Sequence, residues 1–165
     1  MLLDILTFTL IHVVLSLVGI VAGLVVVGGL MAGTRYDGWT GIFLTTTVLT
    51  NLSGFGFPFS TVLPSHIVGG ISLVVLLVAV AARYWKQLAG GWRKTFVISS
   101  VVALYLNVFV LVAQFFIKIP ALIALAPTQG APAFVVTQLI TLVLFVLLGM
   151  AAVKGFRTGQ PAVAR

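Results

Sequence analysis

Long runs of apolar residues, separated by short polar segments, make up most of the chain. The first run, 5–32, ends at the polar turn Thr34-Arg35-Tyr36-Asp37. A bilayer core about 30 Å thick requires a helix of about 20 apolar residues, and a helix also satisfies its own backbone hydrogen bonds in lipid. The pattern therefore predicts an all-α integral membrane protein, a bundle of five transmembrane helices. The predicted spans are 5–32, 39–57, 62–82, 95–117 and 133–153.

Residues 1–157 form a single predicted transmembrane bundle, and 158–165 form a short cytoplasmic tail. Segment 39–57 is the least apolar of the five, because it carries five threonines as well as Asn51 and Ser53. The alternative fold is therefore four spanning helices plus a re-entrant segment at 39–57. An outer-membrane barrel is excluded, since runs such as 13–27 lack the alternation of polar and apolar residues that barrel strands show.

The basic residues fall on one side of the membrane if the chain has five spans and an outside N-terminus. Eight of the nine Lys and Arg residues are then inside, and only Lys118 is outside. Such an excess of positive charge marks the cytoplasmic side of a membrane protein, so we expect the C-terminus inside. The four-helix alternative fits less well, because it leaves Arg35 outside. The eight inner residues are Arg35, Arg83, Lys86, Arg93, Lys94, Lys154, Arg157 and Arg165.

Composition narrows the possible functions further. Only 7% of the residues are charged and 61% are hydrophobic, which is far from the balance of a soluble domain. The chain has no cysteine, so disulfides, thiolate metal centres and covalent haem attachment are excluded. The net charge of +7 is explained by insertion and lipid contact, so nucleic acid is not an expected partner. We expect anionic lipid headgroups on the cytoplasmic side to be bound by Arg83, Lys86, Arg93 and Lys94.

Small residues recur at helical spacing along the predicted spans. In lipid, helices associate through small residues that let their backbones approach closely, and through polar groups that bond across the contact. Span 5–32 contains two Gly-x-x-x-Gly pairs, and the later spans carry further glycines on polar stripes. The predicted helix-packing residues are Gly19, Gly23, Gly29, Gly33, Gly70 and Gly149.

With the predicted topology, the polar side chains within the spans gather in the outer half of the membrane. Buried polar groups in hydrocarbon need partners, so they face one another or a wet cavity. We therefore expect either a polar pocket open toward the outer side, or ordinary hydrogen bonds between helices. The predicted pocket-lining residues are Ser16, Thr50, Asn51, Ser53, Asn107, Gln114, Gln138 and Thr141.

His12 and His66 are predicted to lie at similar depths, a few residues inside two different spans. Two imidazoles from neighbouring helices can ligate one b-type haem iron, or contribute to a quinone site. The alternative is structural: His12 bonds to the next helix, and His66 helps to cap its own helix. The sequence predicts no metal site beyond this pair.

Acid–base catalysis is not expected. The two side-chain carboxylates, Asp4 and Asp37, belong to opposite membrane surfaces in the predicted topology, so they do not form a catalytic pair. Asp37 is instead predicted to be a turn residue beside an ion pair with Arg35.

The leading functional hypothesis is a non-enzymatic multi-pass membrane protein that acts through helix packing, as a self-associating bundle or an accessory subunit of a larger complex. The first alternative is a ligand-binding or redox protein that uses the outer pocket with haem or quinone. A weaker alternative is a small-solute channel or transporter lined by Thr47, Asn51, Asn107 and Gln138.

Four stretches carry a resemblance to known proteins: 36–40 (YDGWT), 103–110 (ALYLNVFV), 125–129 (LAPTQ) and 137–139 (TQL). With these stretches, nearly the whole chain resembles a family of small uncharacterised bacterial inner-membrane proteins. The resemblance implies a bacterial cytoplasmic membrane as the location. It implies no activity and transfers no catalytic residue.

Overall fold

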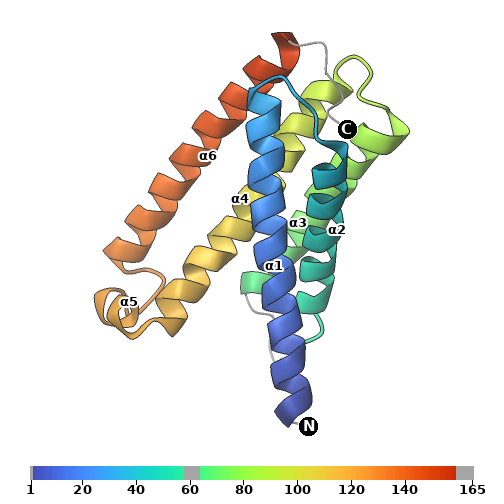
Figure 1. Ribbon diagram of the computed structural model, residues 1–165. Helices are drawn as coiled ribbons and strands as arrows, with labels where there is room; N and C mark the ends of the chain where they lie inside the picture. The colour runs from blue at the N-terminus through green and yellow to red at the C-terminus, as the bar shows by residue number, and fades with distance from the viewer. Residues whose placement is uncertain (1, 58–63, 159–165) are drawn as a thin grey trace.

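The computed structural model describes residues 2–57 and 64–158, and all of its secondary-structure elements are helices (Figure 1). Short π-helical turn η1 continues α3 directly, and short helix α5 connects α4 to α6. The elements are α1 (Leu2–Met31), α2 (Asp37–Gly54), α3 (Pro64–Val80), η1 (Ala81–Trp85), α4 (Trp92–Lys118), α5 (Pro120–Leu125) and α6 (Pro132–Thr158).

Helices α1 and α4 are the central pair of the bundle. Helix α1 contacts α2, α4 and α6, whereas α4 contacts α1, α3 and α6. Each of the five long helices runs opposite to the one before it in the chain (Figure 1). The turns after α1 and η1 therefore lie at the same end of the bundle as the C-terminal end of α6, which we call the basic end for its Lys and Arg residues.

Four helical segments in the described part of the chain are long and apolar enough to cross a membrane: Asp4–Met31, His66–Trp85, Trp92–Lys118 and Pro132–Phe156. They correspond to four of the five predicted spans. Helix α2 covers most of the remaining predicted span, 39–57. Its hydropathy is lower than that of the other four helices, because seven of its 18 residues are Thr, Asn or Ser. It is nevertheless one unbroken helix (Figure 1).

Several predicted boundaries need correction. Residues 120–132, predicted as a loop, contain α5, which starts at Pro120 because proline fits the first turn of a helix. Helix α6 continues past the predicted end at 153 to Thr158. Ahead of α3, Pro58 lies outside the described residues, as do residues 159–165 of the predicted tail.

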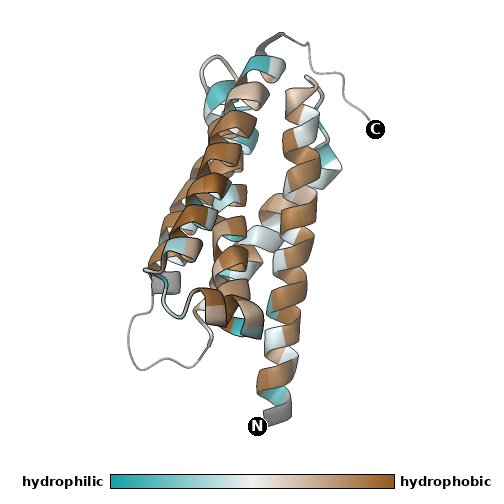
Figure 2. Ribbon diagram, turned by 90° about the vertical axis from the view of Figure 1, so that its left-hand side faces the viewer, coloured by the Kyte–Doolittle hydropathy of each residue, from teal (hydrophilic) through white to brown (hydrophobic). Residues whose placement is uncertain are grey.

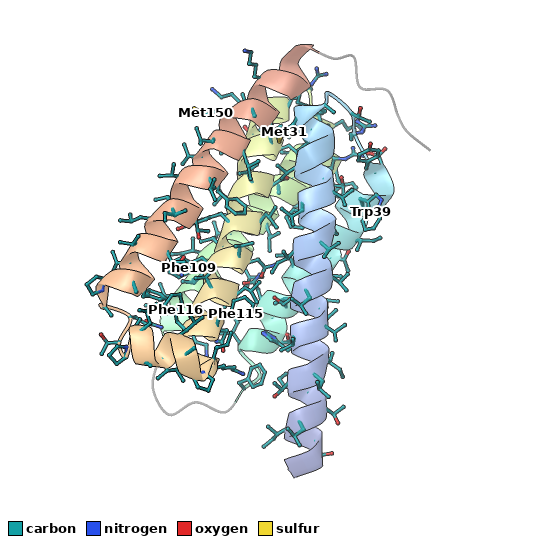
Figure 3. The ribbon with its side chains drawn as sticks, turned by 60° about the vertical axis from the view of Figure 1, so that its left-hand side comes forward. Met31, Trp39, Phe109, Phe115, Phe116 and Met150 are labelled. Carbon is teal, nitrogen blue, oxygen red and sulfur yellow. The ribbon has the colours of Figure 1, made fainter. Side chains whose placement is uncertain are left out.

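The main core lies where α1, α2 and α4 meet. Phe43 of α2 and Leu104 of α4 are fully buried there. A Cβ atom on Gly23 of α1 would lie 2.7 Å from Leu104 Cδ1 and 2.9 Å from the Phe43 ring. The missing side chain at Gly23 thus lets three helices meet at one point. A smaller cluster around Phe116, Phe134 and Ala126 packs α5 against the other end of α4 and α6 (Figure 3).

A second close approach joins α1 to α6. Phe156 is buried, and a Cβ atom on neighbouring Gly155 would overlap the carbonyl oxygen of Met31. The end of α1 therefore lies directly against the backbone of α6, in the stretch that the sequence predicted to be past the last span. Only glycine fits there without movement of one helix.

Two of the predicted packing glycines, Gly33 and Gly70, do not lie at a contact between helices. Gly33 follows the end of α1 with φ +72°, and the bonds from its N–H to Leu30 O and from Thr34 N–H to Gly29 O close the helix. A Cβ atom on Gly70 would meet nothing within 4 Å, whereas one on Gly69 would lie 3.7 Å from Asn51 Oδ1 of α2 and 3.5 Å from the ring of Phe55, which follows α2. Gly33 is therefore a helix-capping residue, and Gly69 faces α2 in place of Gly70.

An ion-pair cluster links two turns at the basic end. Asp37 Oδ1 lies 2.7 Å from Arg35 Nε and 2.6 Å from an Nη atom of Arg83. The predicted pair of Arg35 with Asp37 is confirmed, and Arg83 of η1 is a partner that the sequence did not reveal. Because Asp37 is also in the first turn of α2, its charge stabilises the positive end of that helix.

We predict that Gly155→Ala weakens the packing of α1 on α6. The added methyl group overlaps the Met31 carbonyl, so the free energy of unfolding should fall by about 1–3 kcal/mol. Gly28→Ala is the matched control, since nothing lies within 4 Å of its added Cβ and alanine favours a helix. Thermal unfolding in detergent measures both. Equal melting temperatures for the two variants would contradict the close approach at Gly155.

Candidate functional site

Four of the eight polar side chains predicted to line a pocket bond to the backbone of their own helix. Thr50 donates to Thr46 O at 2.8 Å, and Asn51 donates to Thr47 O at 2.8 Å. Thr141 likewise donates to the carbonyl of Thr137 at 2.8 Å. Such bonds satisfy a polar group in apolar surroundings without a partner helix. They account for these side chains without a ligand.

His12 forms a direct polar contact between α1 and α2. Its Nδ1 lies 2.8 Å from Ser53 Oγ, and its ring meets the edge of Phe57 with centroids 5.2 Å apart. Ser53 Oγ also donates to Thr50 O at 3.0 Å, so the hydroxyl hydrogen is available to only one of these two partners. If Ser53 uses it for Thr50, then His12 Nδ1–H donates to Ser53. This bond is of the structural kind expected for His12.

His66 contacts a different part of the same region. Its ring stacks on Phe55 at 5.5 Å between centroids, with an angle of 29° between the planes. The residues around the end of α2 thus lie against both imidazoles, one from α1 and one from α3. An axial haem pair requires the two rings to face a shared iron. The contacts observed give the haem and quinone hypotheses no support.

The polar contacts deepest in the bundle surround Gly19 on α1. A Cβ atom there would lie 3.0 Å from Thr47 Oγ1, 3.1 Å from Thr46 Oγ1 and 3.4 Å from Asn107 Nδ2. Side chains from α2 and α4 therefore converge on a bare stretch of the α1 backbone. We call Gly19, Thr46, Thr47 and Asn107 the Gly19 layer.

Two atoms of the Gly19 layer are buried without a hydrogen-bond partner among the described residues: Thr47 Oγ1 and Asn107 Nδ2. Most buried polar groups in proteins are paired, and an unpaired one costs about 1–3 kcal/mol. Ser100 Oγ, two turns along α4 from Asn107, is in the same condition. These groups are neutral, so the arrangement can bind hydrogen-bonding groups but supplies no charge.

Gln138 joins α6 to α4 outside the Gly19 layer. Its Nε2 donates to the Phe109 carbonyl at 3.0 Å, while its buried Oε1 has no partner among the described residues. The remaining predicted pocket residues, Ser16 and Gln114, are half-buried on α1 and α4. The structure thus brings together His12 with Ser53, and Asn107 with Gly19.

Thr46 and Thr47 were not among the predicted pocket-lining residues, although Thr47 belonged to the channel alternative. For Thr47 the sequence contained a signal, because its spacing places it on one helical face with Phe43 and Thr40, and the structure buries all three. The run of three threonines at 45–47 hides this signal, since each points in a different direction around the helix.

The four residues predicted to bind lipid headgroups have different surroundings. Arg83 is largely buried and paired with Asp37, so it is committed within the protein. Arg93 lies over the Phe156 ring at 5.4 Å, and Lys86 lies over Trp92 at 5.5 Å. Lys94 is exposed beside a groove between α4 and α6. Arg83 is therefore corrected from a headgroup contact to an internal ion pair.

Comparison with known proteins finds no matching family model, no similar curated protein and no similar solved structure.

We predict that Thr47→Val leaves the free energy of unfolding unchanged or raises it by up to about 1 kcal/mol, because the lost hydroxyl has no partner among the described residues. Ser53→Ala is the comparison, since it removes the contact with His12 between helices and should cost about 0.6–2 kcal/mol. Unfolding in lipid–detergent bicelles measures both variants. A loss for Thr47→Val as large as that for Ser53→Ala would show that the Thr47 hydroxyl is bonded in the folded protein.

Proposed function

We propose that the chain is a non-enzymatic, multi-pass membrane protein whose bundle associates with a second copy of itself through the outer face of α2. Its outer surface supports the membrane location, because large aliphatic side chains are exposed along every long helix. Its polar side chains Thr47, Ser100, Asn107 and Gln138 are buried instead. Figure 2 shows hydrophobic residues along the middle of the helices and hydrophilic ones mainly toward their ends.

In this proposal, α2 is the fifth helix that crosses the membrane. Its 18 residues give a length of about 27 Å, close to the roughly 30 Å of a hydrocarbon core. Most of its polar groups are either bonded to its own backbone or turned toward α1 and α4, as at Thr47. A helix with this distribution can lie in lipid although its average hydropathy is modest.

The orientation follows from the ends of the bundle. Lys118 lies at the end of the bundle opposite the basic end. The six basic residues at the basic end are Arg35, Arg83, Lys86, Arg93, Lys94 and Lys154. Arg157 and Arg165 were predicted to join them, but their side chains lie outside the described residues. An excess of Lys and Arg marks the cytoplasmic side, so the basic end should face the cytoplasm of a bacterial cell.

Cysteine labelling tests both the orientation and the crossing by α2. The chain has no native cysteine, so Asp4→Cys, Lys86→Cys and Lys118→Cys each provide a single thiol. We predict that a membrane-impermeant maleimide labels positions 4 and 118 in intact cells, and position 86 only after permeabilisation. Positions 4 and 86 lie on opposite sides only if α2 crosses. Labelling of both from the same side would contradict a five-helix topology.

The observation that carries the proposed association is the composition of the outer face of α2. A Cβ atom added to Gly38 or Gly41 would meet nothing within 4 Å, and Thr45 is exposed one turn further along. Ile42 and Leu49 are exposed on the same side of α2, but they are interrupted by these small residues, whereas the exposed positions of α6 are mostly large apolar residues such as Val143 and Leu147. In lipid, small and hydroxyl-bearing residues favour contact between helices, whereas large aliphatic residues favour contact with acyl chains.

A second copy fits this face for a geometric reason. A two-fold dimer contact uses the same surface from both subunits, so the surface must complement itself. Small residues at Gly38, Gly41 and Thr45 follow one another at steps of three and four, which places them on one side of α2. Two such faces allow the backbones to approach closely near the start of α2, where the exposed side chains of Ile42, Leu49 and Leu52 pack beside the contact.

Single-cysteine cross-linking tests the dimer contact. We predict that Gly41→Cys and Thr45→Cys form disulfide-linked dimers when membranes are oxidised, because each residue lies near its counterpart at a two-fold contact. Val143→Cys is the matched control on the exposed face of α6 and should remain monomeric. Non-reducing gels measure the dimer fraction, and Gly41→Leu should lower the dimer population by at least tenfold.

Three outcomes would contradict the dimer. Equal cross-linking at positions 41 and 143 would show random collision rather than a specific contact. A chain that stays monomeric at every lipid-to-protein ratio would exclude self-association. If Gly41→Leu instead releases one defined, stoichiometric partner protein, the same face serves an accessory-subunit role and the second copy is rejected.

A further inference from the structure

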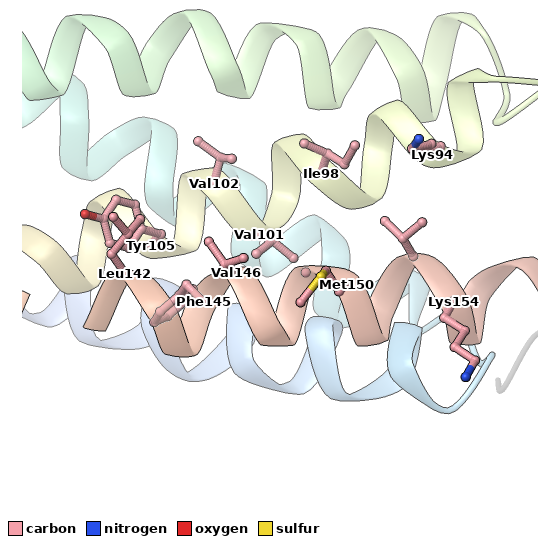
Figure 4. Close-up of a pocket in the computed structure, with 12 residues that line it drawn as sticks. Lys94, Ile98, Val101, Val102, Tyr105, Leu142, Phe145, Val146, Met150 and Lys154 are labelled. Carbon is pink, nitrogen blue, oxygen red and sulfur yellow. The ribbon is translucent and has the colours of Figure 1, made fainter. Parts of the chain in front are cut away.

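A groove of about 810 Å³ runs between α4 and α6, away from both the Gly19 layer and the α2 face (Figure 4). Val101 and Phe145 are buried at its floor, while Ile98, Val146 and Met150 are exposed along its walls. Gly149 belongs to the same lining and allows the close contact, since its Cβ would lie 3.4 Å from Val101. The groove is therefore apolar and open to the outside of the bundle.

The length of the groove matches one membrane leaflet. Its lining on α4 extends from Lys94 to Tyr105, a distance of about 17 Å at 1.5 Å per residue. Half of a hydrocarbon core is about 15 Å deep. Because Lys94 is near the start of α4 at the basic end, the groove extends from the cytoplasmic surface of the proposed topology to near the middle of the bilayer.

Cations gather at only one end of the groove. Lys94 and Lys154 both line it there, while Tyr105 and Leu142 lie at the other end (Figure 4). A smaller hollow of about 310 Å³ adjoins this end, shares Lys94 with the groove and adds Arg93. The described residues that line the two hollows include these three cations and no carboxylate.

We propose that this groove is a binding site for one phospholipid with an anionic headgroup. Its phosphate lies between Lys94 and Lys154 with Arg93 nearby, and one acyl chain follows the apolar walls toward Tyr105. The site differs from a general attraction of lipids to basic residues, because it combines a defined apolar channel with charges at one end. The inference rests on the proposed membrane location, but not on the dimer through α2.

The charges favour a lipid over another helix. The described residues at one end of the groove carry positive charge and no carboxylate, and a phosphate complements them, whereas a helix brings no net negative charge there. A second copy of the chain is therefore the less suitable occupant of this surface.

Native mass spectrometry of the delipidated full chain tests the site, with phosphatidylglycerol and phosphatidylcholine as probes. We predict that Lys94→Gln with Lys154→Gln weakens phosphatidylglycerol binding by about 30-fold, as expected for two charges near a lipid phosphate. Phosphatidylcholine binding should change little. The matched control, Lys86→Gln with Lys118→Gln, removes the same number of charges outside the groove and should weaken phosphatidylglycerol binding by no more than about fivefold, the effect of the single headgroup contact expected at Lys86.

A groove-filling variant separates the channel from the charges. Val146→Trp keeps both lysines and places a large ring over the floor, so it should also reduce phosphatidylglycerol binding by at least tenfold. If the groove double variant and the control double variant lost phosphatidylglycerol affinity equally, the effect would depend only on total charge, and the site would be overturned. Unchanged binding in Val146→Trp would overturn the acyl-chain path. Specific cross-linking of Met150→Cys between two copies would assign the groove to a helix and overturn the lipid.

Membrane fractionation keeps this test distinct from the proposed function. If the wild-type chain is not recovered in membranes, the membrane location itself fails. If all variants reside in membranes with the wild-type melting temperature and still bind the lipid equally, only the lipid site fails. If Val146→Trp unfolds, Val102→Trp replaces it on the opposite wall of the groove.

Discussion

Close approach of helix backbones at a few glycines is the constraint on which the rest of the bundle depends. In lipid there is little hydrophobic drive between helices, so dispersion contacts at short range must hold them together. At Gly23, α1 comes close enough for Phe43 and Leu104 to meet from two other helices. At Gly155, α6 comes against the end of α1 itself. These two contacts hold one side of α1 against α2, α4 and α6, and the separate outer surfaces of α2 and α6 follow from that position.

The helices themselves were predictable, but their ends and contacts were not. Runs of apolar residues identified four long helices, because length and hydropathy alone decide whether a segment suits a membrane. Helix α2 was predicted despite its polar content, yet that content keeps it below the apolarity of the others. The extension of α6 through Gly155 and Phe156 depends on contacts with Met31 and Arg93, which are distant in sequence. Periodicity along one helix contains no information about such partners.

Much less of the candidate site could be read from the sequence. Polar residues in an apolar helix stand out in the sequence. The sequence does not show, however, whether a threonine bonds to the backbone of its own helix or faces another helix. Thr50 and Thr47 show the difference: the first donates to Thr46 O, and the second converges with Asn107 on Gly19. The prediction also chose Gly70 instead of the adjacent Gly69. In the structure Ser72 is buried, and Gly69 shares a helical face with it, so Gly69 is the glycine that faces the bundle.

The two surfaces left on the outside of the bundle differ in the kind of neighbour that they suit. Small residues, as on the outer face of α2, let the backbone of a second helix come close. Acyl chains pack less densely against such a surface than a helix does. A groove with aliphatic walls, as between α4 and α6, is filled by a flexible chain that adapts to Gly149 and Met150. The lysines at its end add a charge preference that the α2 face lacks. We therefore propose that one bundle binds a second copy and a lipid at the same time, because the α2 face and the groove between α4 and α6 belong to different helices.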